Sequence, residues 1–327
     1  MNEVIRTVRG DISPEDLGYC QTHEHIWCDY RMGERSELDS RVRRDPSDTM
    51  LYDEFDRMLE ELILYRDMGG EAIVDVTTNH WRPDHRTLVE LSAASGVHIV
   101  ATGGFYVSST IPRAIDEMSL VEISAMLVDE LREGDPVTGA RVGLFKSAIS
   151  GARIEGTELK ALRAVARAML ETGAAMTTHT DGGTRYEIPG GTVGPQHMKV
   201  FQEEGVSADR LIVGHVDERP DIALLTELAS EGCYIQFDVL GKMHWLLDET
   251  RAHLIAQMRN RGYLDRILLG TDRCRKAELY RDMGGVGYTY PFERFFDTLR
   301  REGGMSNSEI EVITRENPAR ALAIPSD

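Results

Sequence analysis

The feature that most constrains the fold of this chain is a regular alternation of short apolar runs with longer amphipathic ones, repeated eight times along 327 residues. Several short runs, such as AIVDV and RILLG, are almost continuously apolar, which is typical of parallel strands covered on both faces. The predicted strands span Gly18–His25, Glu71–Thr78, His98–Tyr106, Val142–Ile149, Ala174–Thr180, Arg210–Val216, Cys233–Val239 and Arg266–Asp272.

A helical pattern follows nearly every predicted strand. Apolar residues recur at spacings of three and four over Leu51–Tyr65 and over Leu159–Met169, which predicts two amphipathic helices. Two further helix starts are predicted by capping boxes, which pair Ser119 with Glu122 and Ser306 with Glu309.

Eight strand–helix units in series predict an α/β protein with a closed (β/α)8 TIM barrel, formed by residues 1–327 as one domain. At roughly 150 residues per domain the length suggests two domains, but a closed barrel often occupies about 250 residues by itself. An open doubly wound sheet is the alternative architecture. Because no GxGxxG motif follows the first predicted strand, the sequence favours the barrel.

The charge balance narrows the classes of partner. The chain carries 37 Lys and Arg residues against 55 Asp and Glu residues, which gives a formal net charge of −18. A field of that sign repels phosphate backbones and anionic lipid surfaces, so a nucleic-acid or membrane partner is disfavoured. A small anionic substrate held by a local basic cluster remains compatible with this charge.

Cysteine usage and hydropathy indicate the compartment. The four cysteines form no CxxC pair and show no spacing typical of a disulfide framework, which indicates a reducing environment. The N-terminal residues lack the apolar run of a signal peptide, and no apolar stretch approaches the roughly 20 residues of a membrane span. We therefore expect a cytoplasmic protein that acts on a small molecule.

Polar residues occur where a barrel places its chemistry, at the C-terminal ends of the strands. The candidates are His23 and His25 in the first strand, Lys146 in the fourth, His179 in the fifth, His215 in the sixth and Asp272 in the eighth. The first two share one face because side chains alternate along a strand. Imidazole and oxygen ligands in this combination suit two divalent cations, which can polarise a carbonyl or phosphoryl oxygen.

Each of these residues also has an ordinary structural explanation. A pair of strand-end histidines can simply be hydrogen-bonded to its neighbours, Lys146 can be paired with an acid, and Asp272 can cap the helix that follows. Lys146 is the most informative, because its neighbours are apolar and an unpaired buried ammonium is costly. A neutral amine that takes up carbon dioxide becomes a carbamate, which can bridge two cations. The joint occurrence at matching strand ends favours the metal site.

This pattern resembles the amidohydrolase superfamily, and the local sequence motifs are most similar to its phosphotriesterase-related family. The similarity covers essentially the whole chain. It is carried by the opening TVRGDISPEDLGYCQTHEHIW and by DVTTN, TGGFY, TTHT, GHVDE and ENPARAL. The fold implied by this resemblance is the same barrel, and the implied cofactors are two divalent cations, zinc or alternatively manganese or cobalt.

The resemblance also implies roles for individual residues. His23, His25 and Asp272 would hold the more buried metal, and His179 and His215 the more exposed one. Lys146, carbamylated by carbon dioxide, would bridge the two metals together with a hydroxide. Asp272 would also orient that hydroxide and accept its proton, and Tyr106 would line the pocket near the exposed metal. By analogy with the family, a homodimer is expected.

The residues after Asp272 depart from the commonest pattern of that family. Gly270-Thr271-Asp272 stands where many members have Ser-His-Asp, and basic residues follow it. This arrangement resembles a branch that hydrolyses phosphorylated sugar lactones. A cluster of basic side chains beside a metal site is unexpected in a chain with a net charge of −18. Because Arg and Lys both bind phosphate, the cluster indicates a phosphate-binding pocket. The predicted substrate-binding residues are Lys242, Arg273, Arg275 and Lys276, with Arg185 as a further candidate.

These basic residues can alternatively form a solvated face or pair with Glu278 and Asp282. The sequence nonetheless predicts a metal-dependent lactonase acting on a small phosphorylated sugar lactone. The rival enzymes within the family are a phosphotriesterase, an acyl-homoserine lactonase and a carboxylesterase, each acting on an uncharged substrate. A non-catalytic binding protein on the same barrel is disfavoured, because no ligand position is missing.

Overall fold

The computed structural model describes residues 3–35, 50–149, 153–180, 193–218 and 220–326. Its centre is an eight-stranded parallel sheet in the order β12-β11-β10-β9-β8-β7-β6-β3. The strands are β3 (Cys20–Glu24), β6 (Ala72–Asp75), β7 (His98–Gly104), β8 (Val142–Ile149), β9 (Met176–Thr180), β10 (Leu211–Val213), β11 (Tyr234–Phe237) and β12 (Ile267–Leu269). All eight lie within the predicted ranges and in the predicted order.

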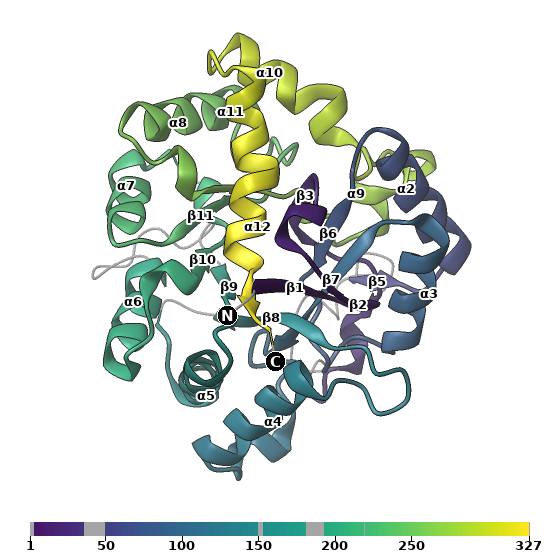
Figure 1. The fold of residues 1–327 in the computed structure, drawn as a ribbon, viewed down its shortest axis with the longest axis vertical. Helices are drawn as coiled ribbons and strands as arrows, with labels where there is room; N and C mark the ends of the chain where they lie inside the picture. Colours follow the sequence, from purple (N-terminus) through teal and green to yellow (C-terminus); the bar gives the residue numbers. More distant parts are fainter. Residues whose placement is uncertain (1–2, 36–49, 150–152, 181–192, 219, 327) are drawn as a thin grey trace.

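The sheet curls until its two edge strands meet. Thr22 Oγ1 of β3 donates to the Leu269 carbonyl of β12 at 2.9 Å, and the Asp272 amide donates to the His23 carbonyl at 3.0 Å. Helices lie around the outside of the strands (Figure 1). The predicted (β/α)8 barrel is therefore confirmed.

The described helices are α2 (Phe55–Asp67), α3 (His85–Ser95), α4 (Leu120–Arg132), α5 (Gly156–Thr172), α6 (Val193–Glu204), α7 (Ile222–Ser230), α8 (Asp248–Asn260), α9 (Lys276–Leu279), α10 (Phe296–Arg301), α11 (Asn307–Glu311) and α12 (Asn317–Leu322). Both predicted capping boxes are present, at the starts of α4 and α11. One predicted boundary is wrong. Leu51–Tyr52 forms a short strand, β5, paired with β4 (Cys28–Asp29), so the helix begins only at Phe55.

A second, three-stranded antiparallel sheet was not predicted. It contains β1 (Glu3–Thr7), β2 (Gly10–Ile12) and β13 (Ile324–Pro325), and it brings the two ends of the chain together (Figure 1). The Val8 amide, just after β1, donates to the Ile99 carbonyl near the start of β7 at 2.9 Å. This sheet therefore closes the N-terminal end of the barrel, opposite the end that carries the polar residues.

We call the N-terminal end of the barrel, which the small sheet closes, the lower end, and the C-terminal end the upper end. Side chains inside the lower half of the barrel form one buried apolar cluster. Ile5 of β1 joins Val74, Val100, Leu144 and Leu268 in it, and all five are fully buried. Among the described helices, none is long and apolar enough to cross a membrane.

Candidate metal and substrate site

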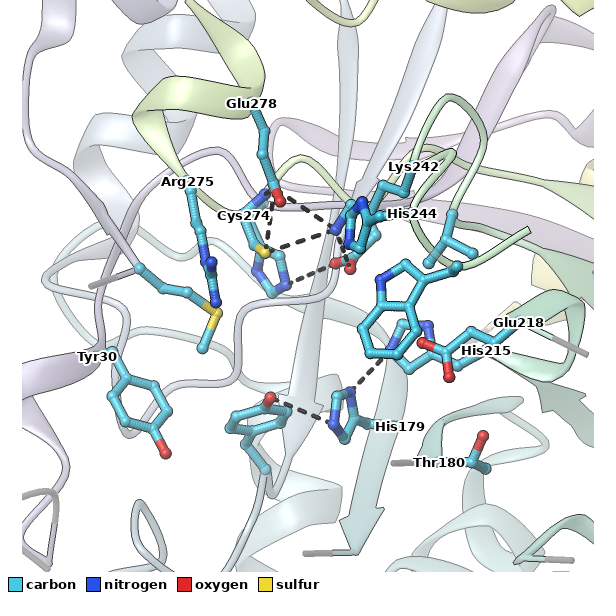
Figure 2. Close-up of a pocket in the computed structure, with 16 residues that line it drawn as sticks. Tyr30, His179, Thr180, His215, Glu218, Lys242, His244, Cys274, Arg275 and Glu278 are labelled. Atoms are coloured by element: carbon cyan, nitrogen blue, oxygen red, sulfur yellow. Dashed lines mark hydrogen bonds and ion pairs between the residues drawn. The ribbon is translucent and has the colours of Figure 1, made fainter. Parts of the chain in front are cut away.

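A cavity of about 280 Å³ opens at the C-terminal ends of the strands. Its lining includes His25, directly after β3, His179 of β9, and His215 and Asp272, which follow β10 and β12. Figure 2 shows His179 and His215 side by side in this cavity. Short strands with long connecting segments place these side chains together because parallel strands end on the same side of the barrel.

His23 and His25 both face Asp272. Their Nε2 atoms lie 3.8 Å and 3.5 Å from Asp272 Oδ1. These three residues form one of two described groups whose ligand atoms lie close enough together to hold a metal ion. Burial lowers the pKa of both imidazoles, that of His25 well below its usual value. Both rings are therefore neutral, which is the form that binds metal.

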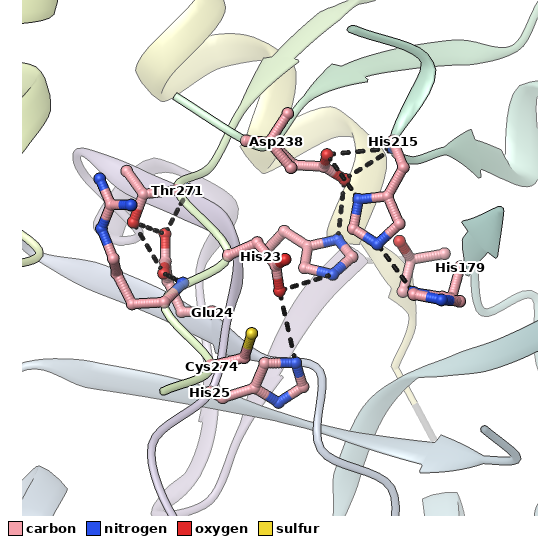
Figure 3. Close-up of polar contacts among 12 residues, drawn as sticks. His23, Glu24, His25, His179, His215, Asp238, Thr271 and Cys274 are labelled. Carbon is pink, nitrogen blue, oxygen red and sulfur yellow. Dashed lines mark hydrogen bonds and ion pairs between the residues drawn. The ribbon is translucent and has the colours of Figure 1, made fainter. Parts of the chain in front are cut away.

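Asp238, directly after β11, contacts the Nδ1 atoms of both His23 and His215. Its carboxylate lies 3.0 Å from His23 Nδ1 and 2.9 Å from His215 Nδ1, and it accepts the His215 amide (Figure 3). A partner on Nδ1 leaves Nε2 for a metal or a substrate. His23, His215 and Asp238 also form the second potential metal-binding group. No motif in the sequence pointed to Asp238.

His179 and His215 lie together on the other side of the cavity. His215 Nε2 is 2.8 Å from His179 Nδ1, and the Tyr106 hydroxyl is 3.4 Å from His179 Nε2. Although burial opposes a charged ring, the Asp238 carboxylate raises the pKa of His215 to about 9. Tyr106 lines the cavity beside these rings, as the sequence predicted.

Lys146 reaches the same site from β8. Its side chain is fully buried, and its Nζ has no hydrogen-bond partner among the described residues. The Nζ lies 5.0 Å from the centre of the Tyr106 ring. Burial lowers the pKa of this amine to about 8, so a larger share of it is neutral at pH 7 than for an ordinary lysine.

Two site residues have strained backbones. His215 and Asp272 have φ values of 56° and 46°, and they are the non-glycine residues with positive φ in the described part of the chain. Such a conformation costs on the order of 1–3 kcal/mol and persists only where the surroundings impose it. Asp238 holds the His215 amide and the His23 carbonyl holds the Asp272 amide, so the site itself imposes both.

Glu24, between the two β3 histidines, anchors the segment that carries Asp272. It points away from His23 and His25 because side chains alternate along the strand. Its carboxylate accepts the amide and hydroxyl of Thr271 and the amide of Arg273. Burial raises its pKa to about 7. The HxH pattern contained this residue, but only the contact with Thr271 shows what it does.

The basic residues predicted to bind substrate separate into two groups. Lys242 and Arg275 line the cavity, and Lys242 Nζ donates to Asp272 Oδ2 at 2.8 Å (Figure 2). Burial opposes the charge of Lys242, but Asp272 and other acidic neighbours raise its pKa above the ordinary value.

The other predicted basic residues lie elsewhere. Arg273 is buried with its guanidinium on the Leu240 carbonyl, and Lys276 pairs with Asp53 at 2.7 Å and Glu54 at 2.8 Å. Neither belongs to the described lining of the cavity, so for these two the contact with substrate stays a prediction. The local sequence could not separate Arg273 from Arg275, because the direction of Arg273 depends on its contacts with Leu240 and Glu24. Arg185 lies outside the described residues.

The donor set fits two divalent cations. It combines four imidazoles, the Asp272 carboxylate and a buried lysine. Within the described residues, the buried His23 Nε2 and Lys146 Nζ have no hydrogen-bond partner. Buried polar atoms usually have a partner, so two unpaired ones among these side chains fit residues that would hold a cation.

Known proteins are similar to this chain in sequence and in fold. The sequence model of the phosphotriesterase family matches residues 3–322. The rat N-acetyltaurine hydrolase is 28% identical over 97% of both chains.

Two solved structures are also similar. A phosphotriesterase homology protein from Escherichia coli, complexed with phosphate in its active site, has a TM-score of 0.83 and 27% identity, and covers 94% of this chain and 99% of its own. A lactonase from Listeria monocytogenes has a TM-score of 0.87 and 25% identity, and covers 99% of this chain and 100% of its own.

Proposed function

This chain belongs to the phosphotriesterase family and is a hydrolase of that type, and from this premise we propose that it is a metal-dependent lactonase that opens a small phosphorylated sugar lactone. The observation that carries the proposal is the position of Lys242 and Arg275, which line the same cavity as the imidazoles and Asp272. A site that combines a carbonyl-activating centre with two basic side chains suits a substrate with a hydrolysable bond and an anionic group.

The family is generally binuclear, and six residues of this chain would hold the metals: His23, His25, Lys146, His179, His215 and Asp272. Zinc suits this ligand set, and manganese and cobalt are alternatives. When bound, two divalent cations supply a Lewis acid for a carbonyl oxygen and a strong nucleophile at neutral pH. Lys146 would help to hold the metals as a carbamate, because its buried amine has no hydrogen-bond partner among the described residues and its lowered pKa provides the neutral form that reacts with carbon dioxide.

The residues of the chain then divide the remaining work. Asp272 is held ionised, since Lys242 and the nearby imidazoles lower its pKa despite burial, so it can accept a proton and pass it to the departing ring oxygen. Lys242 fixes Oδ2 of this carboxylate and leaves Oδ1 toward His25. Tyr106 places its hydroxyl in the cavity beside His179, where it can contact the substrate.

Two similar proteins support an anionic substrate. The Escherichia coli structure holds phosphate in its active site, and N-acetyltaurine is an anion because taurine is a sulfonate. A third, the Listeria monocytogenes structure, is a lactonase and supports lactone hydrolysis. The amide hydrolysed by the rat enzyme makes hydrolysis of an anionic amide the second candidate function, since the same cavity would serve it.

The test is a screen of five- and six-carbon lactones, each with and without a phosphate. Arg275→Ala should lower kcat/KM for a phosphorylated lactone about tenfold or more, because a hydrogen bond to a charged group contributes about 1.5–3 kcal/mol. The matched control is Lys276→Ala, whose side chain is paired with Asp53 and Glu54 outside the cavity. Equal losses on both kinds of lactone, or hydrolysis of uncharged esters and triesters alone, would overturn the proposal in favour of the uncharged-substrate rivals.

A further inference from the structure

Glu278 is an acidic residue in the part of the cavity where the proposed function requires positive charge. It comes from α9 and lines the cavity with Lys242 and Arg275 (Figure 2). Its Oε2 lies 3.5 Å from Lys242 Nζ. The sequence suggested it only as an ion-pair partner of the basic residues, and the family resemblance did not include it.

Lys242 is shared between two carboxylates. Its Nζ is 2.8 Å from Asp272 Oδ2 on one side and 3.5 Å from Glu278 Oε2 on the other, and the lysine is only 7% exposed. One positive charge between two negative ones leaves this cluster with a net negative charge. An anionic group that approaches Lys242 therefore also approaches Glu278, and like charges at such distances repel.

Glu278 is held at this position by more than the lysine. Its Oε2 also accepts the Cys274 amide at 3.3 Å and lies 3.5 Å from Cys274 Sγ. These contacts come from the segment between Asp272 and α9, so the carboxylate stays beside Lys242 when the cavity is empty of substrate. The neighbouring Lys276 does not offset its charge, because it is paired with Asp53 and Glu54.

We propose that Glu278 is a specificity-determining residue that competes with the anionic group of the substrate for Lys242. The proposal rests on the proposed function, in which Lys242 and Arg275 hold that group. An anion binds only if its contacts with Lys242 and Arg275 outweigh the repulsion from Glu278. The site therefore discriminates against weakly charged or badly placed anions, which is a repulsive element of the kind that specificity often needs.

The experiment measures binding of glycerol 3-phosphate, a small phosphate monoester, to the metal-loaded protein by calorimetry. Glu278→Gln removes the charge and keeps the shape, so the dissociation constant should fall about tenfold. The matched control is Glu249→Gln, an exposed residue of α8 outside the described cavity lining, which makes the same change in net charge. The ratio of kcat/KM for a phosphorylated lactone to that for its unphosphorylated form should rise with the same variant.

A double-mutant cycle separates competition for Lys242 from a general field effect. In a Lys242→Met background, Glu278→Gln should tighten binding by a clearly smaller factor, because only the direct repulsion is relieved and no contested cation is set free. Equal tightening in both backgrounds would overturn the proposal. So would weaker binding in Glu278→Gln, since that result would mean that Glu278 orients Lys242 toward the substrate.

Two further results keep the test decisive. Glu278→Asp keeps the charge on a shorter side chain, so its dissociation constant should lie between those of wild type and Glu278→Gln, and an Asp variant that binds as tightly as the Gln variant would contradict the competition. If Lys242→Met binds glycerol phosphate as tightly as wild type, the proposed phosphate subsite itself fails. If Lys242→Met weakens binding but Glu278→Gln changes nothing, only the role of Glu278 fails.

Discussion

Leu144 and Lys146 lie two residues apart on the inward face of β8, the first among apolar side chains and the second in the polar site. Leu144 lies in the lower barrel, fully buried among Ile5, Val74 and Val100. Lys146 lies at the upper end, equally buried, and its amine has no partner among the described residues. One step of the strand pleat thus separates a closed apolar core from a site with unpaired polar atoms.

The two ends of the barrel therefore have different roles, one in stability and the other in the site. The lower end is covered by β1, β2 and β13 and contributes stability through apolar burial. The upper end carries the positive φ values of His215 and Asp272 and a His23 Nε2 that has no hydrogen-bond partner in the described part of the chain, all of which cost stability. We therefore expect substitutions at the upper end to affect turnover and substitutions at the lower end to affect folding.

The largest expected effect is at the upper end of β12. Asp272→Ala should reduce kcat at least a thousandfold, because it removes both a metal ligand and the proposed proton acceptor. The midpoint of thermal unfolding should change by only a few degrees. Asp265→Ala, an exposed residue just before the same strand, is the control and should retain activity. Near-native turnover in Asp272→Ala would show that the proton-relay role is wrong.

At the lower end, Leu144→Ala should lower the free energy of unfolding by about 3 kcal/mol, since it leaves a cavity in a fully buried cluster. Denaturant titration followed by fluorescence measures this change. The exposed Leu170→Ala on α5 should shift the unfolding free energy by no more than about 0.5 kcal/mol. The folded Leu144→Ala enzyme should keep its kcat, and a large loss of turnover without loss of stability would break the division between the two ends.

Lys146→Ala tests the same strand at its other end. Activity should fall about a hundredfold or more, while the unfolding free energy changes far less than in Leu144→Ala. Formate, acetate or propionate should restore part of the activity by filling the space of the carbamate. The exposed Lys199→Ala on α6 should behave as wild type. Electron density that ends at the amine nitrogen in a metal-loaded crystal would refute the carbamate.

The smallest effect is expected outside the barrel. Ser306→Ala removes the side chain that accepts the Glu309 amide in the capping box of α11, so the unfolding free energy should fall by about 1 kcal/mol. Ser207→Ala is the control, because this N-cap residue makes no capping bond. Turnover should be unchanged in both variants, and a specific loss of kcat in Ser306→Ala would show that the outer helices also tune the upper end.

Much of the fold followed from local patterns. Apolar runs and capping boxes depend on residues a few positions apart, so all eight barrel strands and both boxes were predicted. The predicted strand ends were less accurate, because the hydrogen bonds between two strands stop where the backbone amides donate to other acceptors. β10 ends at Val213 since the next two amides donate to Thr178 Oγ1 and to Asp238. The small sheet of β1, β2 and β13 joins opposite ends of the chain, and no local pattern announces it.

Strand order and side-chain alternation can both be predicted from the sequence, and together they place His23, His25, Lys146 and Asp272 at the upper end of the barrel. How those residues are held, and which neighbours contact them, depends on how the folded chain packs. Arg273 and Arg275 are two residues apart, yet one is bound to the Leu240 carbonyl and the other lines the cavity. Glu278 and Asp238 gain their roles from contacts across the barrel mouth, which are set by the packing of loops from different strands.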